Sequence, residues 1–297
     1  PAVLLTSSLP ARDHAAARDR IASGEARIAV GTHALIQRDV AFRELAVAVV
    51  DEQHRFGVTQ RMALSSKSHA VDLLAMTATP IPRTLMLAGY GDLDVSKLTE
   101  KPAGRQPIDT RTIPLERVAE VVDAAGRMIK TGARVYWVCP LIEESEDVDL
   151  ANAEERFRLL SARFPGKVGL IHGRVKSAER EATMAAFSEG KLSILVATTV
   201  IEVGVDVPAA TVMIIEHAER FGLSQLHQLR GRVGRGARES FCILIYRTPL
   251  SETARQRLKV IFESQDGFAI ARADLELRGP GEYLGARQSG APLLRFA

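Results

Sequence analysis

Short apolar runs alternate along this chain with stretches whose apolar residues recur at helical spacing. Such runs are typical of buried strands, and the stretches between them of amphipathic helices. Strands are predicted at residues 2–5, 27–30, 45–50, 71–76, 133–139, 167–171, 193–197, 211–215 and 240–246. Helices are predicted at 11–23, 83–89, 116–130, 152–164, 178–188, 223–233 and 252–263, with residues 270–277 forming a hairpin with the last. This alternation predicts an α/β fold of parallel sheets covered by crossover helices.

A segment rich in proline and glycine interrupts the pattern. Pro102, Gly104 and Pro107 mark a hinge or linker, after which the alternation of strands and helices restarts. We therefore predict a first α/β domain at residues 1–104, a linker at 105–115, a second α/β domain at 116–248, and a helical hairpin with a loop at 249–297.

Composition supports two domains with buried cores, because the chain has 297 residues, of which 46% are apolar and 25% charged. No apolar run approaches the length of a membrane span, and no secretion signal is recognised. The net charge of +3 permits a polyanionic partner without requiring one. Cys139 and Cys242 lie in apolar runs, so we expect buried free thiols in a reducing cytoplasm, and neither has zinc-site spacing.

Two acids, Asp51 and Glu52, directly follow the apolar run at residues 45–50. In an open α/β sheet the carboxyl ends of the strands are where ligands bind. Asp51 suits a Mg²⁺ ion held through water, and Glu52 suits a base that orients and deprotonates an attacking water. The alternative is a pair of solvated acids at a strand end. Thr77 and Thr79, which end the next apolar run, favour the chemical interpretation.

A basic segment at residues 228–235 reads QLRGRVGR. On a helix, Gln228, Arg232 and Arg235 would share one face. Arginine stabilises the charge that builds on a transferring phosphoryl group. The alternative is a solvated basic helix face, but two glycines, each costing about 1 kcal/mol against alanine in a helix, argue against it.

Small polar residues at two further strand ends complete the candidate set. Hydroxyls and a glycine backbone can hold phosphates, and a carboxylate can accept from a ribose hydroxyl. A simple turn is the alternative, and histidines are more often structural. The residues are Thr198, Thr199, Gly204 and Asp206 after residue 197, and Thr32 and His33 after residue 31.

Together these strings resemble the motor of superfamily 2 helicases, and in particular the RecG family of branched-DNA helicases. The shared motifs are DEQH (51–54), TAT (77–79), ATTVIEVGVDVP (197–208) and QLRGRVGRG (228–236). More specific are DEQHRFGV (51–58), TATPIPRTL (77–85), YGDLDVSKL (90–98) and DGFAIARADLELRGPGEYLGARQSG (266–290). The transcription-repair coupling factor shares much of this module, but LRGPGE and YGDLDVS favour RecG. The primosome helicase is less similar because its zinc-binding cysteines are absent.

The resemblance implies two RecA-like domains, the first incomplete, that use ATP and Mg²⁺ to remodel stalled forks and Holliday junctions in repair and recombination. It implies a monomer acting on branched or duplex DNA in the bacterial cytoplasm at the nucleoid, and it leaves a single-strand-binding protein open as a partner. The catalytic roles fall to Asp51 (Mg²⁺), Glu52 (base), Arg232 and Arg235 (arginine fingers) and Gln228 (positioning). Coupling to nucleotide or DNA falls to Gln53, His54, Thr32, His33, Thr77, Thr79, Thr198, Thr199, Gly204 and Asp206, and stepping along DNA to Arg278, Arg287 and Gln288.

One part of such a motor, the phosphate-cradling loop GxxxxGK[ST], is not in this sequence. Gly166-Lys167 is followed by Val168, and Gly190-Lys191 by Leu192. Without the strand that precedes this loop, strand edges and apolar faces would be left uncovered. We therefore expect a piece of a longer protein that hydrolyses almost no ATP alone. A non-catalytic DNA-binding fragment and a nucleotide-binding protein unrelated to DNA remain the alternatives.

Overall fold

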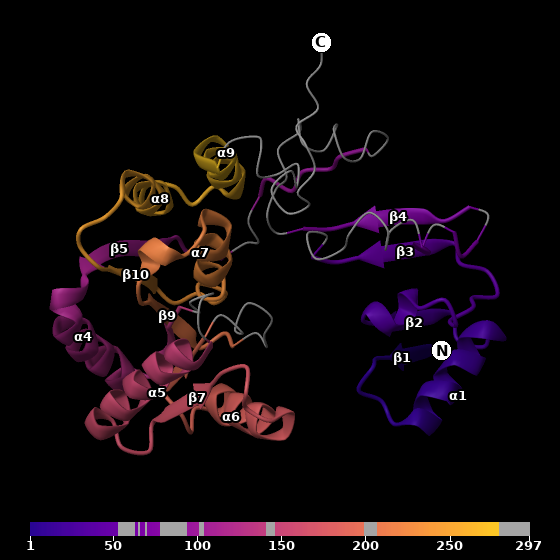
Figure 1. The fold of residues 1–297 in the computed structure, drawn as a ribbon, viewed down its shortest axis with the longest axis horizontal. Helices are drawn as coiled ribbons and strands as arrows, with labels where there is room; N and C mark the ends of the chain where they lie inside the picture. The colour runs from indigo at the N-terminus through magenta and orange to yellow at the C-terminus, as the bar shows by residue number, and fades with distance from the viewer. Residues whose placement is uncertain are drawn as a thin grey trace, which may run out of the picture. The chain divides into compact units, whose positions relative to one another are not determined.

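A computed structural model describes residues 1–52, 63–64, 66–68, 70–77, 94–100, 104–140, 146–198 and 207–278, without the side chains of 146–149 and 278. The chain forms two compact units, divided between Ala78 and Thr79 (Figure 1). The first contains β1 (Ala2–Leu5), α1 (Ala11–Ala22), β2 (Ile28–Gly31), the 3-10 turn η1 (His33–Ile36), β3 (Val47–Val50) and β4 (Asp72–Ala75). The predicted strands are therefore confirmed in this unit, whereas the predicted helix at 83–89 lies outside the described residues.

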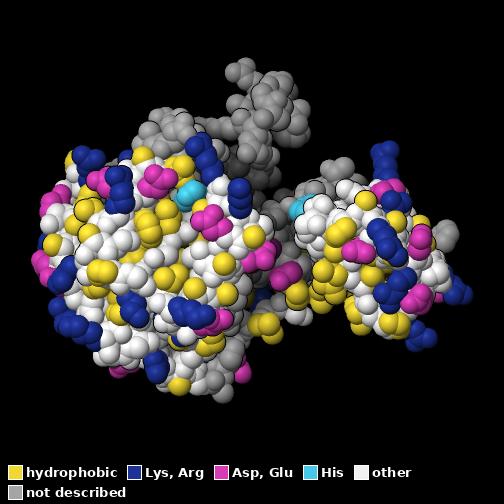
Figure 2. Space-filling model, turned by 90° about the horizontal axis from the view of Figure 1, so that it is seen from below, with side chains coloured by type: hydrophobic (Ala, Val, Ile, Leu, Met, Phe, Trp, Pro, Cys, Tyr) yellow, Lys and Arg dark blue, Asp and Glu magenta, His cyan; other side chains and the backbone are white. Residues whose placement is uncertain are grey.

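The first unit contains two small parallel sheets. β1 pairs with β2, and β3 with β4, without a described strand joining the pairs. Leu5 packs with Ala17 and Ile21 of α1 in a small core. More than half of the surface of several other strand residues is exposed, namely Leu4, Ile28, Val30, Val47, Val49 and Leu74. Figure 2 shows hydrophobic side chains at the surface of this unit.

The second unit is built on a parallel sheet of six strands in the order β5-β10-β9-β6-β8-β7. The strands are β5 (Ile108–Pro114), β6 (Arg134–Val138), β7 (Val168–Ile171), β8 (Ile194–Ala197), β9 (Ala210–Ile215) and β10 (Ser240–Tyr246). The helices are α4 (Val118–Lys130), α5 (Glu146–Arg163), α6 (Ser177–Glu189), α7 (Leu223–Arg230), α8 (Glu252–Glu263) and α9 (Gly267–Arg278), with 3-10 turns η3 (Leu115–Arg117) and η5 (Ala218–Arg220).

Both faces of this sheet are covered, which explains its near-continuous apolar strands. Side chains alternate between faces along a strand. Tyr136 and Val138 of β6 accordingly enter a core that includes residues of α6, α7, α8 and α9. Val135 and Trp137 enter the opposite core, which α4 and α5 complete. Figure 1 shows α7, α8 and α9 gathered on one side of the sheet. The arrangement confirms the predicted α/β class and the helical hairpin.

The expected linker at residues 105–115 is wrong for most of its length, because β5 occupies Ile108–Pro114 and pairs in parallel with β10. Ile108 and Thr110 are buried while Asp109 and Arg111 are exposed, so β5 has the alternation of an edge strand. The neighbouring Pro and Gly residues indicated a linker and concealed this pattern.

Candidate functional site

The acid pair lies at the carboxyl end of β3, as predicted. The Oδ1 atom of Asp51 accepts a hydrogen bond from the backbone N–H of Glu52 at 2.9 Å. Glu52 has a φ of 51°, in the left-handed region. A residue other than glycine is held there at a cost of about 1–3 kcal/mol, and such strain gathers at functional sites. Asp51 is exposed and Glu52 half-buried. Gln53 and His54 lie outside the described residues.

The register of β3 and β4 brings Thr77 to the same sheet edge as the acids. Val50 pairs with Ala75, and the N–H of Met76 donates to the carbonyl of Val50 at 2.8 Å. Thr77 follows Met76, so both strand ends present polar groups side by side. Thr79 lies outside the described residues.

Thr32 and His33 follow β2, at the carboxyl end of the other strand pair, and both are exposed. The N–H of Thr32 donates to the carbonyl of Leu5 at 3.4 Å. A Cβ on Gly31 would lie 2.1 Å from that same carbonyl oxygen, so only glycine allows the approach of the two strand ends.

The arginine segment does not continue the helix, which corrects the shared helical face predicted for Gln228, Arg232 and Arg235. α7 ends at Arg230, so only Gln228 is helical. Gly234 has a φ of 74°, and a Cβ on it would lie 2.8 Å from the side chain of Ile108. Both the turn and the close packing require glycine there. The side chain of Arg235 points back toward the end of α7, because its Nε donates to the carbonyl of Gly231 at 3.2 Å.

Arg230, which the sequence analysis did not select, is 2% exposed. Its Nη1 donates to the carbonyl of Ile261 at 2.6 Å and lies 3.4 Å from Oγ1 of Thr110. Its Nη2 lies 3.2 Å from Nδ1 of His227. Burial lowers the pKa of the guanidinium. Arg230 follows Leu223 and Leu226 at helical spacing, so the periodicity of α7 alone places it on the buried side.

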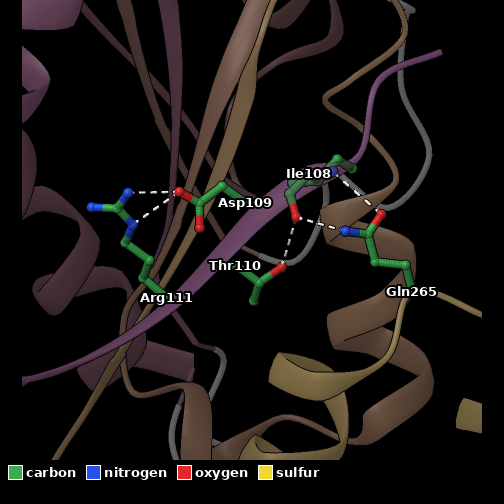
Figure 3. Close-up of polar contacts among 5 residues, drawn as sticks. All are labelled: Ile108, Asp109, Thr110, Arg111 and Gln265. Atoms are coloured by element: carbon green, nitrogen blue, oxygen red, sulfur yellow. Dashed lines mark hydrogen bonds and ion pairs between the residues drawn. The ribbon is translucent and has the colours of Figure 1, made fainter.

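The hairpin of α8 and α9 is joined to the rest of the second unit by polar contacts. The turn between the helices is fixed by Gln265, whose amide donates to the carbonyl of Ile108 at 3.0 Å and accepts from its N–H at 3.3 Å (Figure 3). The hydroxyl of Ser224 in α7 donates to Asp274 of α9 at 2.9 Å, and Asp274 is buried. α9 ends at Arg278, and Arg287 and Gln288 lie outside the described residues.

Thr198 lies at the carboxyl end of β8, where its N–H donates to the carbonyl of Ile171 at 3.2 Å. Its side chain is 1% exposed, and its hydroxyl has no hydrogen-bond partner among the described groups. Thr199, Gly204 and Asp206 lie outside the described residues. The acids belong to the first unit and the arginines to the second, so their meeting across a cleft stays a prediction.

Comparison with known proteins defines the class. Residues 116–237 match the helicase conserved C-terminal domain. The RNA-bound Dbp5 structure from S. cerevisiae is 16% identical with a TM-score of 0.59, covering 94% of this chain and 68% of that one, and supports the fold alone. The second unit is therefore a helicase C-terminal domain with a RecA-like fold. None of the described helices is long and apolar enough to cross a membrane.

A narrower family is also defined. The ATP-dependent DNA helicase RecG of Acidithiobacillus ferridurans is 56% identical over 280 residues, 94% of this chain and 41% of the relative. RecG of Escherichia coli (strain K12) is 54% identical over 281 residues, 93% of this chain and 40% of the relative. A structure of RecG bound to a three-way DNA junction has a TM-score of 0.73 and 43% identity, covering 95% of this chain and 36% of that one. The chain belongs to the RecG family, and it spans about two fifths of the length of these relatives.

Proposed function

We propose that this chain carries the greater part of an ATP-driven helicase motor that remodels branched DNA. One observation carries the proposal. More than half of the aligned residues are identical to those of RecG helicases, and the alignment covers more than nine tenths of this chain. The carboxylates at the end of β3 and the arginines after α7 are the chemistry that such a motor needs.

The acid pair suits a magnesium nucleotide. Asp51 is exposed at a strand end, so it can hold Mg²⁺ through water, which this ion retains when it binds proteins. Bound ATP with Mg²⁺ would supply the phosphoryl group whose transfer to water drives movement. Glu52 would orient that water and accept its proton. We expect His54, Gly204 and Asp206 to approach the nucleotide as well.

The arginines would act from the second unit. Arg232 and Arg235 carry guanidiniums that would stabilise the charge on the transferring phosphoryl group once the units close, with Gln228 positioning the reacting groups. Their loop packs through Gly234 on Ile108, and Ile108 also holds Gln265 of the hairpin turn. A shift of the arginine loop, the segment that carries Arg232 and Arg235, would therefore be transmitted to the hairpin through Ile108 at the start of β5.

Movement along DNA would use polar groups at strand ends and the tail after α9. In this proposal the backbone of branched or duplex DNA is contacted by Thr32, His33, Thr77, Thr79, Thr198 and Thr199, and the step along it is made by Arg278, Arg287 and Gln288. We further propose a monomer at work in the bacterial cytoplasm at the nucleoid, with a single-strand-binding protein as an additional partner to test.

The test compares Glu52→Gln with Glu44→Gln, an exposed acid in the same unit, in the complete natural protein. Loss of a general base costs about 10²–10⁴-fold in rate, so DNA-stimulated ATP hydrolysis and fork remodelling should fall by that order in the first variant only. Retained hydrolysis in Glu52→Gln would exclude the assigned base.

Three further outcomes test the proposal against the alternatives. Robust ATP hydrolysis by the 297-residue chain alone would contradict the need for a phosphate-cradling loop. Movement on plain duplex without any preference for branches would indicate a translocase of the coupling-factor kind. Salt-dependent DNA binding that never responds to nucleotide would indicate a non-catalytic binding protein.

A further inference from the structure

The carbonyl oxygen of Gly231, the residue that follows α7, accepts hydrogen bonds from two arginines. Nε of Arg235 donates to it at 3.2 Å, and Nη2 of Arg105 donates to it at 3.5 Å. A carbonyl oxygen has two lone pairs, so it can accept from both side chains at once. The last carbonyls of a helix have no partner within the helix, and cations are favoured at that end. The two guanidiniums therefore share one acceptor at the carboxyl end of α7.

The two arginines differ in how firmly they are held. Arg235 is exposed, whereas Arg105 is half-buried and lies three residues before Ile108, the first residue of β5. The N–H and C=O of Ile108 are both hydrogen-bonded to Gln265. Within the described part of the chain, the Gly231 carbonyl is the only group to which Arg105 donates a hydrogen bond. The anchored start of β5 thus keeps Arg105 beside the arginine loop, while Arg235 can turn toward solvent.

We propose that Arg105 is a positioning residue for Arg235, an inference that rests on the arginine-finger role proposed above. When Arg235 turns toward the transferring phosphoryl group, its Nε leaves the Gly231 carbonyl. Arg105 keeps that carbonyl paired, so the loop holds its shape and no terminal carbonyl of α7 is left without a donor. Like charges repel, so Arg105 also favours the departure of the neighbouring guanidinium.

A purely structural role for Arg105 makes different predictions. The segment that leads into β5 also carries Lys97, whose Nζ lies 5.6 Å from the centre of the Phe268 ring in α9. If this segment only had to be tied to the second unit, ATP hydrolysis would depend on Lys97 as much as on Arg105. A positioning role depends on Arg105 alone and acts only through Arg235. The rate of hydrolysis and its dependence on Arg235 therefore distinguish the two roles.

The test measures DNA-stimulated ATP hydrolysis by variants of the complete natural protein. Arg105→Met removes the donor and keeps much of the side-chain volume. We expect kcat to fall about tenfold while KM for ATP stays unchanged, because the charged donor is needed only when Arg235 moves, after ATP has bound. Arg105→Lys restores a cation without the shape of the guanidinium, so it should recover part of the rate. Arg111→Met, on an exposed arginine of β5, and Lys97→Met should leave kcat unchanged.

A double variant tests whether Arg105 acts through Arg235. Arg105→Met/Arg235→Ala should hydrolyse ATP no more slowly than Arg235→Ala alone. Urea unfolding checks the fold of each variant, and Arg105→Lys carries the comparison if Arg105→Met is unfolded.

Three results would overturn the proposal: an unchanged kcat in Arg105→Met, an equal loss in Lys97→Met, or additive losses in the double variant. In each of these cases the motor assignment stands as long as Arg235→Ala is slow. Full hydrolysis by Arg235→Ala would instead remove the arginine-finger role, and this proposal with it.

Discussion

The guanidinium of Arg230 lies 2.6 Å from the carbonyl oxygen of Ile261, in the last turn of α8. The last four carbonyls of a helix have no partner within it, and a cation is favoured at that end. Arg230 therefore satisfies a terminal carbonyl of α8 while it ends α7. Since Arg232 and Arg235 follow directly, the segment with the proposed arginine fingers is attached to the hairpin at its first residue.

Arg230→Met should test this attachment. Methionine keeps much of the side-chain volume but leaves the carbonyl of Ile261 without its donor, which costs about 1–3 kcal/mol of unfolding free energy. Urea unfolding of the complete protein measures the loss. If Arg230 also positions the arginine loop, kcat for ATP should fall more than KM changes. Arg220→Met, on an exposed residue just before α7, is the control, and equal effects of the two variants would contradict the assignment.

Gly234→Ala separates backbone strain from packing. A left-handed φ alone costs alanine about 1 kcal/mol, and at residue 234 the new Cβ also meets Ile108 at 2.8 Å. Gly166 has a similar φ of 69° with nothing within 4 Å of the Cβ position. We therefore expect Gly234→Ala to lower the unfolding free energy by about 1–3 kcal/mol more than Gly166→Ala does, as overpacking does elsewhere. Equal losses of unfolding free energy in the two variants, measured by urea unfolding, would show that the Ile108 side chain moves aside without cost.

A physical reason explains which elements the sequence predicts correctly and which it does not. Strands buried on both faces, such as β6 and β8, are predicted by their continuous apolar runs. β10 has the same bounds in the structure as in the prediction. β5 is an edge strand with polar residues on one side and Pro nearby, so local signals resembled a linker. α7 ends just before Gly231, a local signal that the helical-face interpretation passed over, whereas the packing of Gly234 against Ile108, 126 residues earlier, is not visible in any local pattern. The acids and threonines could be placed at strand ends because parallel sheets gather those ends at one edge.

Glu219→Gln should change the pH dependence of stability. Burial raises the pKa of the Glu219 carboxyl, but hydrogen bonds from His217 and from the N–H of Arg247 outweigh it, so the pKa is lowered. A lowered pKa in the folded state stabilises the fold above the ordinary value, 4.5, and that stabilisation is lost as the pH falls through the folded value.

The difference in unfolding free energy between the natural protein and Glu219→Gln should therefore be largest near pH 7 and should shrink below about pH 4. Urea unfolding across this range measures it. Glu154→Gln, on the exposed side of α5, should show no such trend. A difference that grows on acidification would mean that the hydrogen bonds to Glu219 do not favour its ionised form.

The ion pair of Arg156 and Glu216 gives the last prediction. It joins α5 to the end of β9, and Trp137 of β6 donates to the same carboxylate at 2.5 Å. The guanidinium also lies over the indole ring, 5.4 Å from its centre. Glu216→Gln or Arg156→Met alone leaves a largely buried charge without its partner, so each should lower the unfolding free energy by about 2–3 kcal/mol. The double variant should lose less than the sum, with a coupling of about 1–2 kcal/mol.

Trp137 is the one tryptophan of the 297-residue chain, so its fluorescence during urea unfolding of that chain reports on this cluster directly. The exposed pair of Arg117 and Glu120 is the matched control, in which the same substitutions should be additive. Additive losses at Arg156 and Glu216 would mean that Trp137, not the opposite charge, holds the carboxylate in place. The end of β9 would then be anchored by the indole alone, and Trp137→Phe should destabilise the sheet more than either charge variant.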